Sequence, residues 1–364
     1  MKKLLLCSAA ALGVALSAAP AAAQIDVTVG GHSKNYIGWL DQDEAAGADV
    51  RSFDMLRESE LHINAEGTAD NGLVYGFHVE MEVDSEDGAA GNDIEESYVY
   101  LSSNFGRINL GSEDGANYLL QVAAPSADAN IDGIRQYINP VNYTAAPAGF
   151  GGLAGTSIDY ANDATGTSQK ITYLSPVFSG FQVGASYTPD VTDAEVTGLS
   201  GFNNKAGLLA AGDAWEAAAR YEGVFNNVGF AVGAGYTAVD ADNAAAANDD
   251  LNQWNVGLDL DIGAFGIGAV YTETNNVALV DGVDSETWVV GVDYTTGPFQ
   301  FGASYLNNET GAAATLDTDR YTGGVIYTAA PGLTFRGSVS YIDHDAGATD
   351  MDATSVLGGV QFNF

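Results

Sequence analysis

The chain has 364 residues, of which 45 are Gly, 18 are Tyr and 15 are Phe, and it carries a single Cys. Its 48 acidic and 12 basic side chains give a formal net charge of −36 at pH 7. Nucleic-acid binding is excluded, because it requires clustered Lys and Arg to neutralise phosphates. The acidity itself leaves two explanations open, attraction for cations or solubility in salty surroundings.

Residues 1–23 are predicted to be a cleaved secretory signal peptide. Lys2 and Lys3 make the start positive, residues 4–16 are apolar, and Ala21 to Ala23 supply the small residues that a signal peptidase requires. A membrane anchor is the alternative, but this apolar run is too short to span a bilayer as a helix. Export of the chain is the prediction that follows.

Residues 24–364 are predicted to form one unit. Without Lys2 and Lys3, 10 basic side chains remain against 48 acidic ones, a net charge of −38. Since Cys7 belongs to the signal, the mature chain has no disulfide framework. No segment beyond the signal has eighteen consecutive apolar residues, so helical membrane spans are not predicted.

Apolar and polar residues alternate with a period of two along the mature chain. Between Leu73 and Val83 every odd residue is apolar or aromatic, while His78, Glu80 and Glu82 share the other face. Four later segments repeat a row of outward apolar residues with aromatics at its ends. The rows are Phe181, Val183, Ala185, Tyr187; Phe230, Val232, Ala234, Tyr236; Phe265, Ile267, Ala269, Tyr271; and Phe299, Phe301, Ala303, Tyr305. Such rows are typical of strands that cross a membrane.

Short and long connections alternate between these segments. The short ones contain the Gly, Asn and Pro of tight hairpin turns, as in Asp70–Gly72, Asn226-Asn227 and Ala330–Gly332, and the long ones are acidic. This asymmetry is typical of outer-membrane barrels. Sixteen strands are predicted, near residues 25–40, 56–67, 73–84, 93–103, 106–112, 168–175, 181–189, 214–225, 229–239, 251–262, 265–274, 286–295, 299–307, 319–329, 333–343 and 353–364. A barrel of that size encloses an aqueous channel.

One long stretch interrupts the regular pattern, and one shorter stretch is ambiguous. Residues 112–167, between Gly111 and Ser168, are rich in Ala, Gly, Pro and Asp and show no clear strand. A loop of this length in a compact repeat is usually functional or disordered, and this one is predicted to fold into the barrel and narrow it. Leu208 to Arg220 fits either an Ala-rich amphipathic helix or a loop followed by a strand, and the second is favoured.

Three segments resemble the Gram-negative trimeric porins, particularly the α-proteobacterial type. Lys170–Tyr187 resembles the hairpin of the sixth and seventh strands, and Asn104–Gly111 resembles the fifth strand leading into the constriction loop. The end of the chain, Val356, Gly358, Val360, Phe362 and Phe364, resembles the signal read by the barrel-assembly machinery. The resemblance covers the whole mature chain.

This resemblance implies an all-β, transmembrane, antiparallel 16-stranded barrel in the bacterial outer membrane. It further implies a homotrimer in contact with lipid and lipopolysaccharide, without enzymatic activity. The expected function is a water-filled pore for passive diffusion of small hydrophilic solutes and ions. An outer-membrane barrel enzyme and a secreted β-sandwich or adhesin stay as alternatives. The enzyme requires a nucleophile and a base on adjacent strands. The odd or even position of a residue in its strand, which we call its parity and which decides whether it faces inward or outward, does not reveal such a pair.

In such porins the inner loop contributes carboxylates, and the facing wall contributes basic residues. The resemblance therefore implies a constriction with the carboxylates Glu113, Asp114, Asp128 and Asp132, and we expect the last two at its tip. Asp159 and Asp163 follow further along the loop. Charges beside low-dielectric walls act strongly on a passing ion.

Parity places four basic residues of the predicted wall in the lumen: Lys34, Arg220, Arg320 and Arg336. Lys170 shares their parity, and Arg51 lies in the first long loop. A local salt bridge to a neighbouring Glu is the alternative role for each lumen Arg. Inward parity also holds for Glu60, Glu80, Glu82, Glu96, Glu216, Glu222, Asp259 and Asp293. The lumen is therefore expected to be net negative and to prefer cations.

The first two strands differ from the rest on their outward face. Ser33, Asn35, Arg57 and Ser59 fall on the parity that elsewhere faces lipid, where a charge is costly. Contact with another subunit explains them, and a parity slip at a bulge is the alternative.

Other chemistry has little support in the sequence. The histidines His32, His62, His78 and His344 lack metal-site spacing and are interpreted as ordinary lumen or loop residues. No cofactor is predicted. Asp240–Asn243 and Asp343–Asp345 only partly match calcium loops, so we expect at most incidental divalent cations such as calcium at the acidic loops.

Overall fold

The computed structural model describes residues 25–84, 94–126, 138–150, 159–191, 211–242, 248–312 and 315–364. The predicted signal peptide, residues 1–23, lies outside the described residues. So do Asp128 and Asp132, the expected tip of the constriction.

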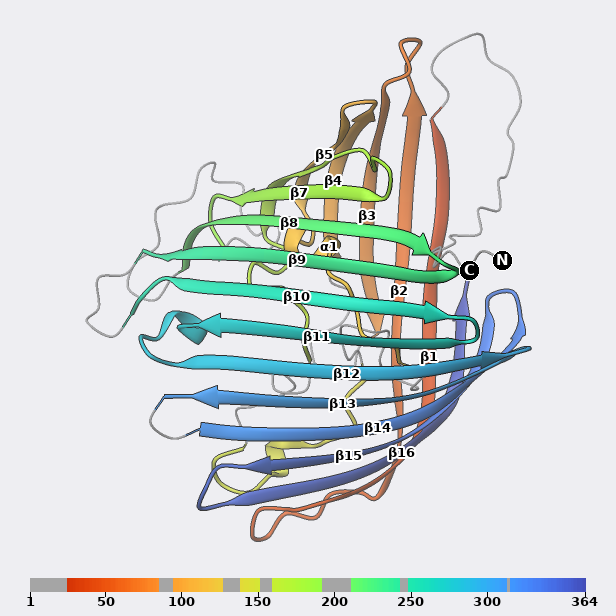
Figure 1. Cartoon of the computed structure of the whole chain (residues 1–364). Coiled ribbons are helices and arrows are strands. Elements are labelled where there is room, and N and C mark those ends of the chain that lie inside the picture. The colour runs from red at the N-terminus through yellow and green to blue at the C-terminus, as the bar shows by residue number, and fades with distance from the viewer. Residues whose placement is uncertain are drawn as a thin grey trace.

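The described residues form sixteen antiparallel strands that close into one barrel, in which each strand pairs with its neighbours in the chain and β16 pairs with β1 (Figure 1). The first eight are β1 (Asp26–Gln42), β2 (Phe53–Thr68), β3 (Val74–Asp84), β4 (Ile94–Ser103), β5 (Gly106–Ser112), β6 (Gln169–Leu174), β7 (Phe181–Thr188) and β8 (Ala211–Phe225). The second eight are β9 (Val228–Ala241), β10 (Leu251–Ile262), β11 (Phe265–Asn275), β12 (Asp284–Thr296), β13 (Phe299–Gly311), β14 (Thr315–Ala330), β15 (Leu333–Asp345) and β16 (Asp350–Asn363). The all-β, 16-stranded prediction is confirmed.

Strand boundaries differ from the prediction mainly on the side of the long connections. β14 begins at Thr315 rather than near residue 319, because Asp317 and Asp319 still pair with Glu309 and Asn307 of β13. The pairing of β13 with β14 thus continues past the apolar segment into acidic residues. From Ala211 onward the ambiguous stretch before Arg220 is strand β8 and not an Ala-rich helix.

Opposite walls of the barrel cross at a steep angle. In Figure 1, β8 to β12 run across the view while β1 and β2 behind them run nearly upright. Barrel closure requires strands to tilt by about 35–45° from the axis, so that opposite walls cross at about twice that angle. Among the described residues of the connections there are three short helices: α1 (Ala116–Leu119), η1 (Tyr143–Ala145) and η2 (Val277–Leu279). In the part of the chain that the structure describes, no helix has the length and apolar character needed to cross a membrane.

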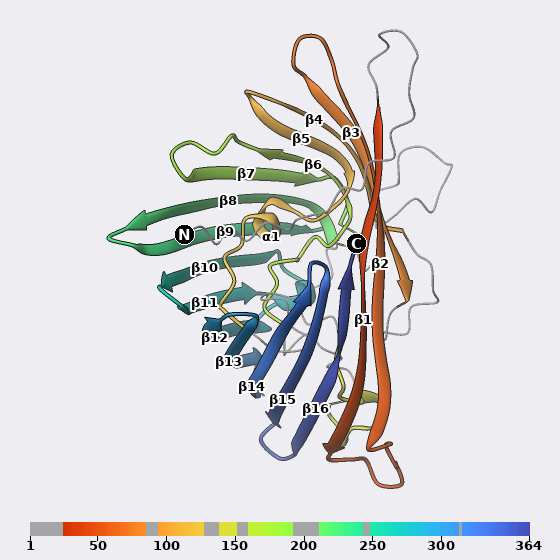
Figure 2. The same cartoon turned by 90° about the vertical axis from the view of Figure 1, so that its right-hand side faces the viewer.

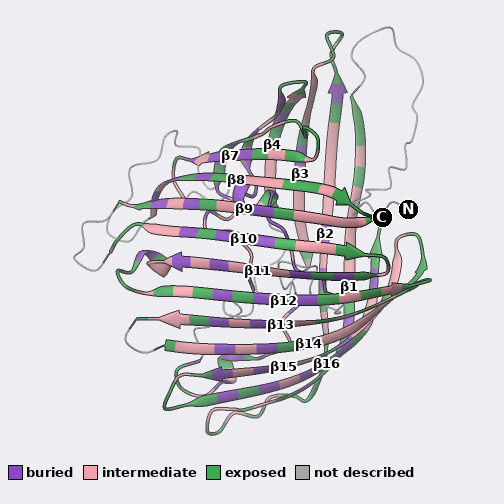
Figure 3. Cartoon of the chain, in the orientation of Figure 1, coloured by how far each residue is buried: buried purple, intermediate pink, exposed green. Residues whose placement is uncertain are grey.

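Burial alternates along the strands, so each strand has an inner and an outer row of side chains (Figure 3). On β1 the even residues Lys34 and Tyr36 are buried, while the odd residues Asn35 and Ile37 are exposed. Tyr36 packs against Ile138 of the connection between β5 and β6, which identifies the even row as the inner one.

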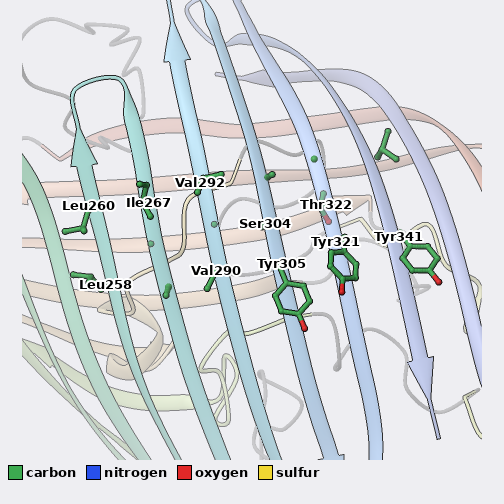
Figure 4. A pocket seen from close by; sticks show the side chains of 16 residues that line it. Leu258, Leu260, Ile267, Val290, Val292, Ser304, Tyr305, Tyr321, Thr322 and Tyr341 are labelled. Atoms are coloured by element: carbon green, nitrogen blue, oxygen red, sulfur yellow. The ribbon is translucent and has the colours of Figure 1, made fainter. Parts of the chain in front are cut away.

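The outer face of the wall from β10 to β15 is apolar and bordered by aromatics. Figure 4 shows Leu258, Ile267 and Val290 in a depression on this face, with Tyr305, Tyr321 and Tyr341 in a row at one level. Ring centroids lie 5.0 Å apart for Tyr305 and Tyr321 and 6.4 Å apart for Tyr321 and Tyr341. The pairs Phe265–Tyr294, at 4.7 Å, and Phe299–Tyr327, at 4.9 Å, form a second row beside the short turns. An apolar band between two aromatic rows is the surface that a membrane-spanning barrel presents to lipid.

Candidate functional site

We call the connection between β5 and β6, residues 113–168, the inner loop; its described segments, residues 113–126, 138–150 and 159–168, lie inside the barrel. Figure 2 shows α1 and the segment after it inside the ring of strands. Ala116 N donates to Ser186 Oγ of β7 at 2.8 Å, and Asn117 N donates to Glu216 Oε2 of β8 at 3.0 Å. Asn117 Nδ2 donates to Thr237 Oγ1 of β9 at 2.9 Å. The start of the loop is thus hydrogen-bonded to three successive strands.

Glycines on the inner face of the wall let the loop backbone lie directly on the sheet. A Cβ at Gly257 of β10 would stand 2.6 Å from Val122 O, and one at Gly291 of β12 would stand 2.0 Å from Pro125 O. Side chains at these positions would displace the loop, since a real Cβ does not approach a carbonyl oxygen so closely. At Gly184, Gly233, Gly235 and Gly268 a Cβ would instead meet loop side chains, those of Ala116, Val122, Asn117 and Pro125 respectively, at 1.8–3.1 Å. These six glycines form a path for residues 116–125, and we call it the glycine track.

The middle of the inner loop contacts the opposite wall. Tyr143 OH lies 2.9 Å from His344 Nε2 of β15. Asn142 N donates to Gln42 Oε1 of β1 at 2.8 Å, and Gln42 Nε2 donates back to Asn142 O at 3.0 Å. Phe150 is fully buried in a cluster with Met351 of β16. In strand order these partners lie seven to eight strands from β8, so the loop reaches both sides of the lumen.

The last part of the loop returns to the first wall. Tyr160 packs against Val270, Val289 and Leu306 of β11, β12 and β13. Thr165 Oγ1 donates to Glu216 Oε1 at 2.6 Å, so the Glu216 carboxylate holds both the start and the end of the loop. Together these contacts narrow the lumen, as the length of the loop predicts.

Glu113 and Asp114 lie at the base of the inner loop, against β4 to β6. Asn109 Nδ2 donates to Glu113 Oε2 at 2.6 Å, and Lys170 Nζ donates to the backbone oxygen of Glu113. Asp114 N donates to Glu96 Oε1 at 3.1 Å. Burial raises the pKa of Glu113 to about 7, against the opposing effect of the Asn109 hydrogen bond. Glu113 and Asp114 therefore lie on the side of the loop that faces the barrel wall.

The four basic residues of the predicted wall divide into two groups. Lys34, Arg320 and Arg336 lie on β1, β14 and β15, on the side that the middle of the loop contacts. Lys34 Nζ is 2.9 Å from Glu58 Oε2, and Arg336 Nε donates to Thr334 Oγ1 at 3.2 Å. Arg320 is 2% exposed.

Arg220 lies on the opposite side, beside the start of the inner loop. Its Nη1 donates to Gln121 O at 3.0 Å, and its Nε lies 2.7 Å from Glu222 Oε1. Arg220 therefore combines a contact to the loop with the local salt bridge that the sequence left as an alternative.

Sequence reasoning did not find the residues that fasten the loop. Glu216 was predicted to face inward, but its role as a common acceptor depends on contacts with residues 117 and 165, far away in the chain. The spacing of Gly233 and Gly235 on β9 with Gly257, Gly268 and Gly291 is the sequence signal that could have found the track, since all share inward parity.

Three histidines that the sequence treats separately also come together. His32, His62 and His78 lie on the inner face of β1, β2 and β3, with ring centroids 6.5 Å apart for the first pair and 5.7 Å apart for the second. Glu60 and Glu80 lie between them. Their shared inward parity on consecutive strands is the sequence signal for this cluster, and rules based on the spacing of metal ligands along the chain miss it.

Comparison with known proteins gives one family for nearly the whole chain. A profile described as Gram-negative porin matches residues 8–362. Uncharacterized proteins of Rickettsia bellii and Rickettsia conorii are 26% identical over 119 residues, which is 30% of this chain and 27% of each relative. The match thus spans about a quarter of the length of these relatives.

Solved structures share the fold over most of the chain. The anion-selective porin from Comamonas acidovorans has a TM-score of 0.65 at 17% identity, covering 94% of this chain and 100% of that one. A loop-deletion variant of the outer membrane protein OmpT of Vibrio cholerae has a TM-score of 0.60 at 17% identity, with coverages of 93% and 99%. A porin refined at 1.8 Å resolution has a TM-score of 0.59 at 20% identity, with coverages of 93% and 100%. At these identities the likeness establishes the fold alone.

Proposed function

The chain belongs to the Gram-negative porin family and is an outer-membrane β-barrel, and on this premise we propose that it forms a water-filled channel for passive diffusion of small hydrophilic solutes and ions. The observation that carries the proposal is the inner loop. It is hydrogen-bonded to Glu216 on one wall and to His344 on the other, which sets a fixed constriction within a lumen too wide for side chains to fill. Membership of this family favours the channel over a barrel enzyme or an adhesin.

We further propose that the channel prefers cations. The inner faces of β2 to β4 and β8 carry Glu60, Glu80, Glu96 and Glu216. The basic side chains Lys34 and Arg220 are each paired with a local carboxylate, which reduces their effect on a passing anion. A fold relative is an anion-selective porin, so the barrel itself does not determine selectivity.

The constriction proposed from the sequence combines the carboxylates Glu113, Asp114, Asp128 and Asp132 with the basic residues Lys34, Arg220, Arg320 and Arg336. Arg220 supports it most directly, because its guanidinium touches the loop backbone at Gln121. Glu113 and Asp114 would act from the base of the loop, and Asp128 and Asp132 from the segment after Ser126.

We propose a homotrimer that contacts its partners through the outer face of β1 and β2. Ser33 Oγ and Ser59 Oγ lie 2.8 Å apart on this face, beside Asn35 and the exposed Arg57. Polar side chains there suit a protein contact better than lipid, whereas the wall from β10 to β15 suits lipid and lipopolysaccharide. The terminal Phe364 would be read by the barrel-assembly machinery.

Liposome swelling tests the channel directly. Liposomes that contain the refolded mature chain should swell in a series of sugars at rates that fall as solute size rises, as expected for diffusion through a constriction. Liposomes with heat-denatured chain serve as the control. Swelling rates equal to that control for every sugar, from protein shown to be folded, would contradict the proposal.

A further inference from the structure

Imidazoles and carboxylates alternate across the inner face of β1 to β4, in the order His32, Glu60, His62, Glu80, His78 and Glu96, and we call this row the histidine ladder. Glu60 Oε2 lies 3.5 Å from His32 Nδ1 and 3.2 Å from His62 Nε2. Glu80 Oε2 lies 3.4 Å from His62 Nδ1 and 3.5 Å from His78 Nε2. Four strands that lie side by side in Figure 2 thus contribute one continuous set of donor atoms.

The outer nitrogens of the two flanking histidines have hydrogen-bond acceptors of their own. His32 Nε2 lies 2.7 Å from Glu58 Oε1, and Glu58 is in turn neutralised by Lys34. His78 Nδ1 lies 2.7 Å from Asn64 Oδ1. An acceptor at one ring nitrogen places the proton there and leaves the lone pair of the other nitrogen for a metal. His32 Nδ1 and His78 Nε2 are therefore set to act as ligands toward Glu60 and Glu80.

The spacing of the donor atoms matches a metal coordination sphere. Ligand atoms about 2.0–2.1 Å from Zn²⁺ in a tetrahedral site lie about 3.3 Å from one another. The four histidine-to-carboxylate distances of the ladder lie between 3.2 and 3.5 Å. Two groups of three residues, His32 with Glu60 and His62, and His62 with His78 and Glu80, each offer ligand atoms that all lie within 4.8 Å of one another.

We propose that the histidine ladder binds one divalent transition-metal ion of the Zn²⁺ class, with His62 as a ligand in either of two overlapping sets. A neutral imidazole has one lone pair, so His62 uses Nε2 with His32 and Glu60, or Nδ1 with His78 and Glu80, and its other nitrogen donates a hydrogen bond to the remaining carboxylate. Two imidazoles and one carboxylate favour Zn²⁺ or Cu²⁺ over Ca²⁺ and Mg²⁺, which prefer oxygen ligands. The site lies in the wall of the lumen, where ions in transit can reach it.

Calorimetric titration of the untagged, chelator-treated mature chain in detergent tests the site. Zn²⁺ should bind with a stoichiometry of one per chain, and Mg²⁺ at the same concentration should give no heat of binding. His62→Asn should weaken Zn²⁺ binding at least tenfold, because it removes a ligand from both sets. Asp259→Asn, which removes an inner-face carboxylate of β10 on the other side of the barrel, should leave Zn²⁺ binding unchanged.

Three results would overturn the site: no Zn²⁺ binding to the wild-type chain, equal binding by the wild-type and His62→Asn chains, or equal loss in the Asp259→Asn control. These readouts do not depend on conductance, so they stay valid even where the channel proposal fails. A second measurement avoids variants altogether: Co²⁺ added to the wild-type chain should give the intense visible absorption of a four-coordinate site, displaced by Zn²⁺. A spectrum identical to that of Co²⁺ in buffer alone would contradict the proposal.

Discussion

Glu216 Oε2 accepts a hydrogen bond from the backbone amide of Asn117 at 3.0 Å, across 99 residues of chain. The other oxygen of the same carboxylate accepts from Thr165 Oγ1 at 2.6 Å. One buried side chain of β8 therefore fastens both ends of the inner loop to the wall.

Replacing Glu216 with Gln should loosen the inner loop. The amide keeps one acceptor oxygen and presents an N–H group to the other donor, which costs about 1–3 kcal/mol for a buried donor left without a partner. Single-channel recording should show higher conductance and more open-channel noise. Asp213→Asn removes a carboxylate on the opposite face of the same strand and should behave as the wild type. Unchanged conductance and noise in Glu216→Gln would show that this carboxylate does not hold the loop.

The glycine track predicts a narrower pore for Gly291→Ala. The new Cβ would stand 2.0 Å from the Pro125 carbonyl oxygen, so the loop must move toward the barrel axis and the conductance should fall. Gly358→Ala on β16 is a matched control, because a Cβ there meets nothing within 4 Å. Equal conductance in the two variants would mean that the loop does not lie against the wall at Gly291.

Selectivity should change with pH through Glu113. Burial raises the pKa of this carboxyl to about 7, so it is mostly protonated at pH 5.5 and mostly ionised at pH 8.5. Ionisation adds one negative charge at the base of the loop, and the preference for cations should therefore rise as pH rises through 7. In Glu113→Gln this rise should be smaller. The difference between the wild type and the variant in the pH dependence of ion selectivity separates the effect of Glu113 from that of the histidines. Reversal potentials in a KCl gradient at both pH values measure it; identical pH profiles would refute a role for this group.

A charge reversal on the outer face of β2 tests the subunit interface. Arg57→Glu should shift the protein from trimer to monomer in mild detergent, since an unfavourable charge in a packed interface costs several kcal/mol. Arg51→Glu is the control, because the Arg51 side chain is 83% exposed in the connection between β1 and β2. Native mass measurement reads the outcome, and a monomeric wild type or an intact Arg57→Glu trimer would exclude this interface.

Much of the barrel could be predicted from local patterns. Period-two alternation locates all sixteen strands, because one face of each meets lipid and the other meets water. The turn at Asn226 and Asn227 is another local feature, and both residues have positive φ, 47° and 67°, which Asn tolerates in a tight hairpin. Strand ends at the long connections were less predictable, because the backbone hydrogen bonding between strands continues there into acidic residues.

The interior of the barrel depends on contacts that no local pattern contains. Asn117 meets strands at residues 216, 237 and 255, and Tyr143 meets residue 344. The histidine ladder likewise depends on the register of β1 to β4, so His32, His62 and His78 appear unrelated in the linear sequence. Parity alone could group such residues on one face, but it cannot show which of them touch.

The protein is proposed to form an open, cation-preferring channel with a constriction set by the inner loop. Planar-bilayer recording of the detergent-purified mature protein under a KCl gradient measures conductance and reversal potential together. We predict large, stable steps in groups of three, with a reversal potential of the sign for K⁺ preference. Anion selectivity would contradict the charge distribution proposed for the lumen, and absence of conductance from protein shown to be folded would contradict the channel itself.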